Sequence, residues 1–222
     1  MFQLIKKSAR SYRYVFIFTY GRSGSTLLMG ILNSLPHYCI RGENGNVLYK
    51  IYEAYAALRA AHASSLKNSE KATNPWFGLH EADPERFANR LVEAFVTQVL
   101  SPGHHRTTGF KEIRFSEAET PDFDGYFTFV REHFPGCRII FNHRNLDDVA
   151  ASKWWSSMPL ARQKLQVIED RFNSIATQED VFHFHYGRID DKLDHVRELF
   201  LFLREPFNEM AVRAVLEIKH SY

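Results

Sequence analysis

The sequence predicts an α/β fold, in which a central, mostly parallel sheet of about four to five strands lies between layers of helices. Three observations support this prediction. Short apolar segments rich in β-branched and aromatic residues alternate along the chain with longer segments of helical periodicity. The first apolar segment leads through a glycine-rich turn directly into a helix. No internal repeat, low-complexity tract or linker interrupts the 222 residues, so we expect a single domain over residues 1–222.

The composition excludes several classes of protein. With 45% hydrophobic and 24% charged residues, the chain has the composition of a soluble globular protein. A formal net charge of +2 is too small to indicate nucleic-acid binding. No apolar stretch approaches the roughly 18 residues of a membrane span, so we expect neither a transmembrane segment nor a signal peptide. Cys39 and Cys137 are too few for a disulfide framework, which favours a reducing, cytoplasmic setting.

The segment 14–35 carries the first strand, the turn and the first helix. Residues 14–20 form an apolar run that suits a strand buried on both faces. Gly21 and Gly24 permit a tight turn, and from Thr26 the apolar residues fall on one face of a helix. Backbone N–H groups of the turn and the helix N-terminus would then point at one spot, an arrangement that binds anions such as phosphate.

This turn is P-loop-like, but it departs from the phosphate-binding loop of nucleotide triphosphatases. The lysine of that pattern is absent, because Gly24 is followed by Ser25 and Thr26. The first glycine of the pattern would fall on Thr19, and the positive charge lies inside the turn at Arg22. The alternative interpretation is an ordinary strand–turn–helix junction whose glycines serve packing.

The rest of the chain continues the alternation of strands and helices. Pro36 ends the first helix, and a short polar passage follows at 39–45. Residues 63–82 have no clear period, and we interpret them as a surface loop or lid in which Trp76 and Phe77 are candidates for stacking on a sugar. Further helices are expected at 47–62, 83–100, 122–134, 146–155, 159–176, 190–203 and 207–218. Further strands are expected at 107–115, 137–142 and 181–186.

The strand at 137–142 is followed by a second candidate anion site. Arg144 lies just beyond its carboxyl end, where ligands bind in sheets of this kind. Ser152 is eight residues later, about 12 Å away along a continuous helix, so the two can share one phosphate only if the chain turns back between them. A surface cation and a hydroxyl on a helix face are the alternative.

The end of this strand offers no carboxylate for a magnesium ion. Nucleotide triphosphatases hold Mg²⁺ with an acidic residue at the end of a neighbouring apolar strand. Asp147 and Asp148 come later, in the expected first turn of a helix, where acidic residues commonly interact with the helix dipole. Together with the missing lysine, this pattern argues against ATP or GTP hydrolysis, and we expect no metal.

Three separate segments carry a resemblance to one known family. Residues 19–26 form the glycine- and serine-rich loop, Arg144 precedes Ser152 by eight residues, and residues 181–190 combine a strand with a tyrosine ahead of Phe-Leu-Arg-Glu-Pro within 199–206. They resemble, in this order, the 5′-phosphosulfate loop, the 3′-phosphate motif and the FL-x-x-P region of sulfotransferases that use PAPS (3′-phosphoadenosine 5′-phosphosulfate). The run Arg-Ser-Gly-Ser-Thr-Leu-Leu is closer to the carbohydrate sulfotransferases, including bacterial ones that modify glycans and glycolipids.

The resemblance implies a donor, an acceptor and a set of site residues. PAPS would donate the sulfonate and leave PAP as the product, and a hydroxyl of a carbohydrate or glycolipid would accept it without a metal. Arg22 would contact the 5′-phosphate and the transferring sulfonate, and Tyr186 would lie near the adenine. Arg144 and Ser152 would bind the 3′-phosphate. The loop would supply the other nucleotide-binding residues, Gly21, Ser23, Gly24, Ser25 and Thr26.

The chain departs from the cytosolic members of that family at three places. Leu27 stands where they carry a tryptophan, and their C-terminal Arg-Lys-Gly segment is absent. Their catalytic base is a histidine in a Thr-His pair after a strand lysine, whereas here Lys111 is followed by Glu112 and Ile113. Lys111 would either position the sulfonate or the acceptor, or pair with a surface acid as a strand-end lysine.

Glu43 is the preferred candidate for the base that takes the acceptor proton. It lies 21 residues after Arg22, and a short return from the first helix would bring it near the carboxyl edge of the sheet. Carbohydrate sulfotransferases that resemble this chain have a glutamate at about this place, although a solvated loop acid is the alternative. Glu112 is the second candidate, and strand alternation would place Lys111 on one face and Glu112 with Arg114 on the other.

Two other functions agree with fewer of these features. A small-molecule kinase would need ATP and Mg²⁺, and a nucleotide-binding module without catalysis would keep the loop but use no base. His183 and His185 share one strand face, but no third metal ligand is evident, so we interpret them as structural. We likewise expect Trp154 and Trp155 to belong to the core.

Overall fold

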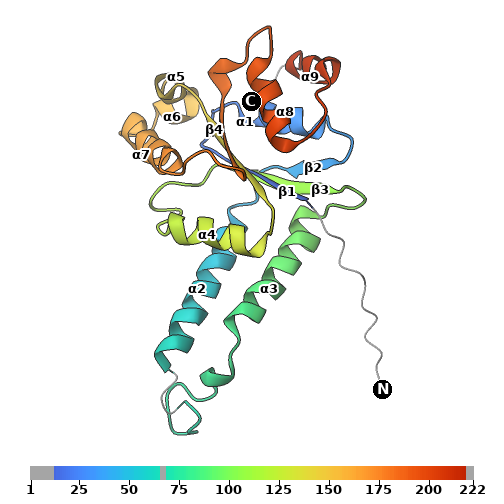
Figure 1. The fold of residues 1–222 in the computed structure, drawn as a ribbon. Helices are drawn as coiled ribbons and strands as arrows, with labels where there is room; N and C mark the ends of the chain where they lie inside the picture. The colour runs from blue at the N-terminus through green and yellow to red at the C-terminus, as the bar shows by residue number, and fades with distance from the viewer. Residues whose placement is uncertain (1–12, 66–68, 219–222) are drawn as a thin grey trace.

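The computed structural model describes residues 13–65 and 69–218, and its centre is a five-stranded, wholly parallel sheet (Figure 1). The strand order is β2-β3-β1-β4-β5, so β1 lies in the middle. The α/β class and the predicted number of strands are confirmed. The strands are β1 Arg13–Phe18, β2 Tyr38–Arg41, β3 Thr107–Glu112, β4 Arg138–His143 and β5 Val181–His185.

Helices cover both faces of the sheet, which gives three layers. The helices α1, α8 and α9 pack on one face, and α2 to α7 contribute to the core on the other. The α-helices are α1 Ser25–Asn33, α2 Val47–Ser65, α3 Pro84–Ala94, α4 Phe123–His133, α5 Leu146–Ala150, α6 Lys153–Ser156, α7 Ala161–Asn173, α8 Asp194–Leu203 and α9 Glu209–Leu216. Shorter helical turns are η1 Leu79–Glu81, the π-helical η2 Phe95–Leu100 and η3 Tyr186–Arg188.

The central strand explains why the first apolar run is continuous rather than alternating. Phe16 and Phe18 are fully buried in the core that includes α2 and α4, whereas Val15 and Ile17 are buried in the core beneath α1 and α8. Successive residues of a strand point to opposite faces, so a strand covered on both sides needs apolar residues at every position.

Strand β2 overlaps the passage at 39–45, which we expected to be polar and in which we predicted no strand. It pairs in parallel with β3 at the edge of the sheet, with Tyr38 and Ile40 buried and Arg41 exposed. Four residues with one polar face are too short to give a clear periodic pattern. Asn33, the last residue of α1, holds the strand in place, because its amide donates to the Ile40 carbonyl (2.9 Å) and accepts from the Ile40 N–H (2.8 Å).

The long helices α2 and α3 form a hairpin that extends away from the sheet (Figure 1). With 19 residues, α2 is about 28 Å long, and it begins just after Glu43. The predicted loop at 63–82 therefore lies at the remote tip of this hairpin, although residues 66–68 are outside the described part. Trp76 and Phe77 are exposed in this segment, which the hairpin carries away from the sheet (Figure 1).

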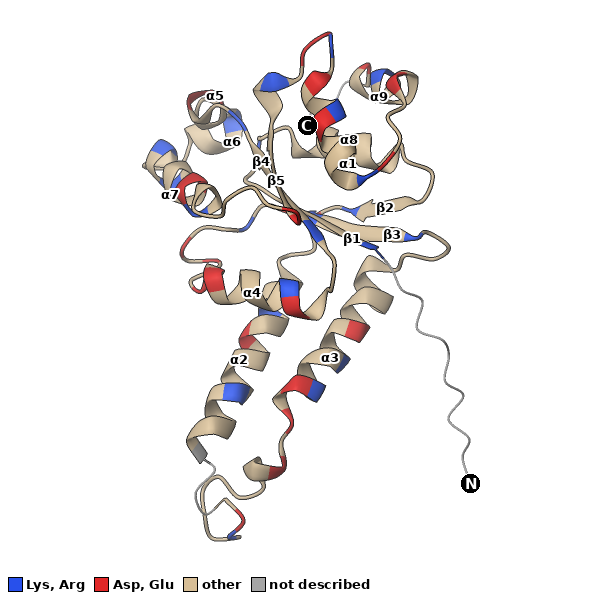
Figure 2. Ribbon diagram, in the orientation of Figure 1, with Lys and Arg blue, Asp and Glu red and all other residues tan. Residues whose placement is uncertain are grey.

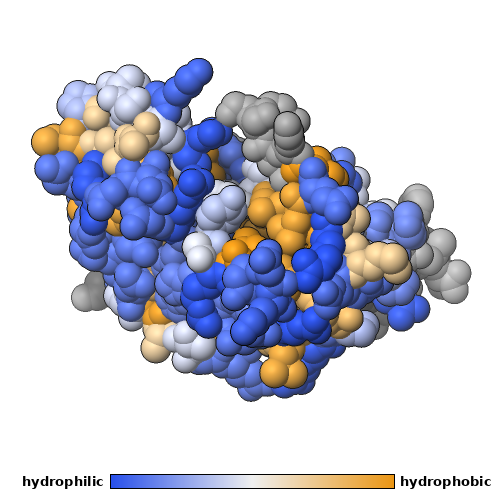
Figure 3. All heavy atoms as spheres, turned by 90° about the horizontal axis from the view of Figure 1, so that it is seen from above, coloured by the Kyte–Doolittle hydropathy of each residue, from blue (hydrophilic) through white to orange (hydrophobic). Residues whose placement is uncertain are grey.

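Charged residues of both signs are interspersed over the helical layers, and neither sign gathers on one face (Figure 2). Seen from above, the surface is mostly hydrophilic, and its hydrophobic residues form separate groups (Figure 3). Within residues 13–65 and 69–218, none of the helices has both the length and the hydropathy that crossing a bilayer requires.

Candidate active site

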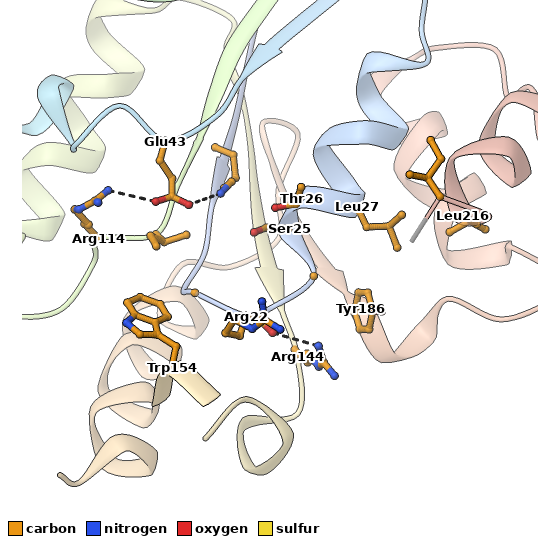
Figure 4. Close-up of a pocket in the computed structure, with 15 residues that line it drawn as sticks. Arg22, Ser25, Thr26, Leu27, Glu43, Arg114, Arg144, Trp154, Tyr186 and Leu216 are labelled. Carbon is orange, nitrogen blue, oxygen red and sulfur yellow. Dashed lines mark hydrogen bonds and ion pairs between the residues drawn. The ribbon is translucent and has the colours of Figure 1, made fainter. Parts of the chain in front are cut away.

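A cavity of about 520 Å³ lies beyond the carboxyl ends of β1 and β3, where ligands bind in sheets of this class. In Figure 4, Glu43 and Trp154 lie at one end of the cavity, Tyr186 lies at the other, and Arg22 lies between them. The cavity brings together most of the residues predicted from the sequence, namely Gly21, Arg22, Gly24, Ser25, Thr26, Glu43, Lys111, Arg144 and Tyr186. Ser23 and Ser152 are not part of its lining.

Aromatic rings pack over the glycine-rich loop, and this explains its two glycines. A Cβ atom on Gly24 would lie 2.2 Å from the Tyr186 ring, and one on Gly21 would lie 1.6 Å from the Trp154 ring. Gly24 also has a φ of +81°, which side chains rarely adopt. The loop backbone is therefore held between two aromatic walls, with the cavity in front of it.

Ser23 anchors the loop instead of facing the cavity. Its hydroxyl lies 2.6 Å from Thr19 Oγ1, and its carbonyl accepts from Asn142 Nδ2 at 3.1 Å, all within a fully buried cluster. The indole N–H of Trp155 ties the same loop to α6 by donating to the Gly21 carbonyl (2.9 Å). Ser23 is therefore outside the cavity lining, and the loop residues whose hydroxyls can reach the cavity are Ser25 and Thr26.

Arg144 is held from both its backbone and its side chain. The Tyr20 hydroxyl accepts from the Arg144 N–H (2.9 Å) and lies 3.0 Å from the Arg144 carbonyl oxygen. The guanidinium donates to the Arg22 carbonyl (3.2 Å) and lies 4.9 Å from the centre of the Tyr186 ring. Burial, reinforced by the charge of Glu169, raises the pKa of Tyr20, so this hydroxyl stays protonated and keeps both contacts. Two cations, Arg22 and Arg144, thus line the same cavity.

Ser152 interrupts the helix that the sequence predicted at 146–155. Helix α5 ends at Ala150, and Ser152 has an extended ψ of 150° before α6 begins. The chain therefore turns between Arg144 and Ser152, but only Arg144 lines the cavity. The Ser152 hydroxyl is one of several buried side-chain groups among the described residues that have no hydrogen-bond partner, and Ser152 lies outside the lining of the cavity.

Glu43 lies at the opposite end of the cavity and is paired with two cations. Its Oε1 is 2.5 Å from Lys111 Nζ, and its Oε2 is 3.5 Å from a guanidinium nitrogen of Arg114. The Lys111 side chain is buried, whereas one third of the Glu43 side chain is exposed, so the carboxylate can contact a ligand. The predicted return from α1 toward the sheet edge is thus present, because β2 delivers Glu43 to this position.

Glu112 has a structural role that leaves it no access to a substrate. It is fully buried, and its carboxylate accepts from the backbone N–H groups of Asn46 (2.8 Å) and Ile113 (2.9 Å) and from Arg114 (2.8 Å). These bonds fix the loop that follows Glu43. Strand alternation grouped Arg114 with Glu112, and the two side chains do pair, although Arg114 also reaches Glu43 because β3 ends at Glu112.

Trp154 and Arg114 line the cavity, and sequence reasoning assigned neither to the site. Trp155 is buried, as expected of a core residue, but Trp154 is 43% exposed at the Glu43 end. The expectation that Trp154 belongs to the core is therefore wrong, because its side chain is exposed at the wall of the cavity. For Trp154, the one available signal in the sequence was its position directly after the Arg144–Ser152 motif.

The histidines behind Arg144 form an internal hydrogen-bond chain. His143 Nε2 lies 2.8 Å from His183 Nδ1, and His183 Nε2 lies 2.7 Å from the Ile175 carbonyl. His143 Nδ1 lies 2.9 Å from Glu169 Oε1. Burial, and then the nearby His143, lowers the pKa of His185 to about 4, so His185 is neutral near pH 7. Both ring nitrogens of His183 are engaged, which agrees with the structural role expected for it.

The geometry combines the glycine-rich loop, two arginines and a carboxylate that line the same cavity. Positive charge on the loop suits a group with several anionic oxygens, and the carboxylate suits a proton transfer next to it. The arginines near Tyr186 and the carboxylate of Glu43 lie toward different ends of one cavity, as a transfer between two ligands requires (Figure 4).

Comparisons with solved structures show the same fold in sulfotransferases. The sulfotransferase domain of the olefin synthase of Synechococcus PCC 7002 has a TM-score of 0.55 at 15% identity, over 96% of this chain and 81% of that one. The sulfotransferase domain from the curacin biosynthetic pathway has a TM-score of 0.52 at 13% identity, over 91% and 77%. The sulfotransferase STF9 of Mycobacterium avium has a TM-score of 0.48 at 15% identity, over 94% and 68%.

The sequence itself gives the assignment that the fold alone does not. No curated protein matches the chain. The model of the sulfotransferase family matches residues 14–207, a range that begins in β1 and ends beyond α8 and so includes the loop, Glu43, Lys111, Arg144 and Tyr186. Because the match covers most of the chain, the protein belongs to the sulfotransferase family.

Proposed function

We propose that this sulfotransferase moves a sulfonate from PAPS to a hydroxyl of a carbohydrate or glycolipid. The observation that carries the proposal is the single cavity in which Arg22 separates a nucleotide end, at Arg144 and Tyr186, from an acceptor end, at Glu43 and Lys111. We also propose a reducing, cytoplasmic setting, with which the two free thiols, Cys39 and Cys137, agree. We further propose that residues 1–222 form one domain.

The residues present suit a nucleotide that is phosphorylated at both 5′ and 3′ positions. The loop from Gly21 to Thr26 would hold the 5′-phosphate, with Arg22 as its cation. Arg144 and Ser152 would bind the 3′-phosphate, and Tyr186 would contact the adenine. Arg144 and Tyr186 line the cavity, whereas Ser152 lies outside its lining. PAPS supplies the sulfonate when it is bound.

The chain's own groups would act on the acceptor and on developing charge. Glu43 would take the proton of the acceptor hydroxyl while that oxygen forms its bond to sulfur. The bond from sulfur to the 5′-phosphate oxygen would break in the same displacement, and its electron pair would stay on the phosphate. Arg22 would stabilise that phosphate, and Lys111, held by Glu43 at 2.5 Å, would lie where the sulfonate oxygens pass.

Ligand-induced stabilisation tests the nucleotide assignment. PAP at about 100 times its Kd should raise the melting temperature by roughly 5–10 °C, because ligand binding to the folded state alone stabilises it. ADP lacks the 3′-phosphate and should raise it much less. Arg144→Ala should remove the advantage of PAP over ADP, whereas Arg90→Ala, on the exposed surface of α3, should keep it. Equal shifts from PAP and ADP in the unmodified protein would contradict the 3′-phosphate assignment.

A further inference from the structure

A second cavity adjoins the candidate active site at its Glu43 end. It has a volume of about 560 Å³ and shares Ile113, Arg114 and Trp154 with the first cavity. This volume lies within the roughly 300–1,000 Å³ that is typical of small-molecule pockets. In Figure 4, Arg114 and Trp154 lie on the side of Glu43, opposite Tyr186. A ligand with its hydroxyl at Glu43 can therefore extend into the second cavity without crossing the nucleotide-binding part.

The walls of this second cavity are mainly apolar. The exposed ring of Trp154 stands at the junction of the two cavities, 5.2 Å from the ring of Trp155. Met158, which is half-buried, and Ile168, which is buried, continue the wall away from the junction. An apolar ligand group would remove the exposed indole surface from water, and this is favourable in proportion to the area covered.

Two of the polar groups around the cavity, Arg114 and Glu119, already have protein partners. Glu117 and Lys164 also line it, but both are exposed, so their charged ends can stay in water. Arg114 is paired with Glu112 and Glu43, as described above. The Glu119 carboxylate accepts from the Ser116 hydroxyl at 2.6 Å. A sugar ring needs hydrogen-bond partners for each hydroxyl that it buries, because an unpaired buried hydroxyl is costly. The lining therefore suits a hydrocarbon or aryl group better than a second sugar.

We propose that the second cavity binds the apolar part of the acceptor, so that the acceptor is an amphiphilic alcohol and not a free sugar. Its hydroxyl-bearing head lies at Glu43, and its apolar group lies along Trp154 and Met158. This inference rests on the proposed sulfonate transfer and narrows its acceptor class to glycolipid-like molecules.

A homologous series of alkyl β-D-glucosides, from methyl to hexyl, tests the inference by binding alone. Tryptophan fluorescence of the PAP-saturated protein reports occupancy near Trp154, in a Trp76→Phe background that removes the tryptophan at the hairpin tip. We expect affinity to rise with chain length by up to about 4-fold per buried methylene, and at least about tenfold from methyl to hexyl. The same affinity for all members would overturn the proposal.

Two methionine variants provide a matched comparison. Met158→Gln places an amide on the cavity wall and should abolish most of the gain with chain length. Met210→Gln, at an 80% exposed site on α9, should leave the gain unchanged. A full gain in Met158→Gln would contradict the placement of the apolar group. The PAP measurement is separate from the chain-length series. If PAP failed to raise the melting temperature, the proposed function itself would be contradicted, whereas a flat chain-length series would contradict only the placement of the apolar group.

Discussion

Replacing Glu43 by glutamine should lower turnover by about 10²–10⁴-fold while PAP affinity barely changes, because removal of a general base typically costs this much in rate. Glutamine keeps the shape of the side chain but cannot accept the acceptor proton. Glu43 lies at the end of the cavity opposite Tyr186, so the nucleotide contacts stay in place (Figure 4). The measurement is turnover with PAPS together with the Kd of PAP for the variant.

Glu112→Gln and Glu53→Gln separate this effect from general damage. Glu112 accepts from three backbone N–H groups and Arg114, so its replacement should lower the melting temperature by leaving one carboxylate contact unmet. Glu53 is paired with Lys50 on the exposed side of α2, and its replacement should change nothing. A Glu43→Gln enzyme with near-normal turnover, beside an inactive but folded Glu112→Gln enzyme that still binds PAP, would transfer the role of base to Glu112.

Arg22→Ala should weaken the nucleotide and slow the reaction at once. A charge-assisted hydrogen bond to a phosphate contributes about 1.5–3 kcal/mol, so the Kd of PAP should rise by about 10–100-fold. Turnover at saturating PAPS should fall as well, because the charge that develops on the leaving phosphate loses its partner. This double effect distinguishes Arg22 from Glu43, whose loss should change the rate alone.

Two control variants accompany Arg22→Ala: one keeps a positive charge at position 22, and the other removes an arginine elsewhere on the surface. Arg22 has a φ of +69°, a conformation that favours glycine. Arg22→Lys keeps a β-carbon and a positive charge at this position, so it should recover part of the affinity that Arg22→Ala loses. Arg90→Ala removes an arginine from the exposed pair with Glu93 and should leave affinity and turnover unchanged. If Arg22→Ala kept full PAP affinity, the loop cation would have no role in holding the nucleotide.

The parts of the site that could be predicted are those encoded locally. A buried strand, a glycine turn and an amphipathic helix follow one another within residues 14–35, so their geometry depends little on the rest of the chain. Glu43 could be placed because only one helix and a short return separate it from that loop. Lys111 followed from its position at the end of a strand that must lie in the same sheet.

The parts that could not be predicted depend on contacts between distant segments. Strand β2 is an edge strand of four residues, and Asn33 and β3 define it more than its own pattern does. Arg114 pairs with both Glu112 (2.8 Å) and Glu43 (3.5 Å), and no periodicity in the sequence reveals this shared contact. The break at Ser152 and the wall formed by Trp154 arise from the packing of α6 on the loop, and the second cavity arises with them.

Transfer of sulfur-labelled sulfonate from PAPS to a glycolipid panel, measured in excess EDTA, tests the central claim most directly. EDTA tests whether the reaction needs a metal ion, which would require carboxylate ligands. Among the described residues that line the cavity, Glu43 is the one carboxylate, and it is already paired with Lys111 and Arg114. We predict that label moves from PAPS to a glycolipid in EDTA, with PAP as the second product, and that γ-phosphate-labelled ATP transfers nothing. Strict Mg²⁺ dependence with phosphate transferred from ATP, and no use of PAPS, would contradict the account and favour a small-molecule kinase.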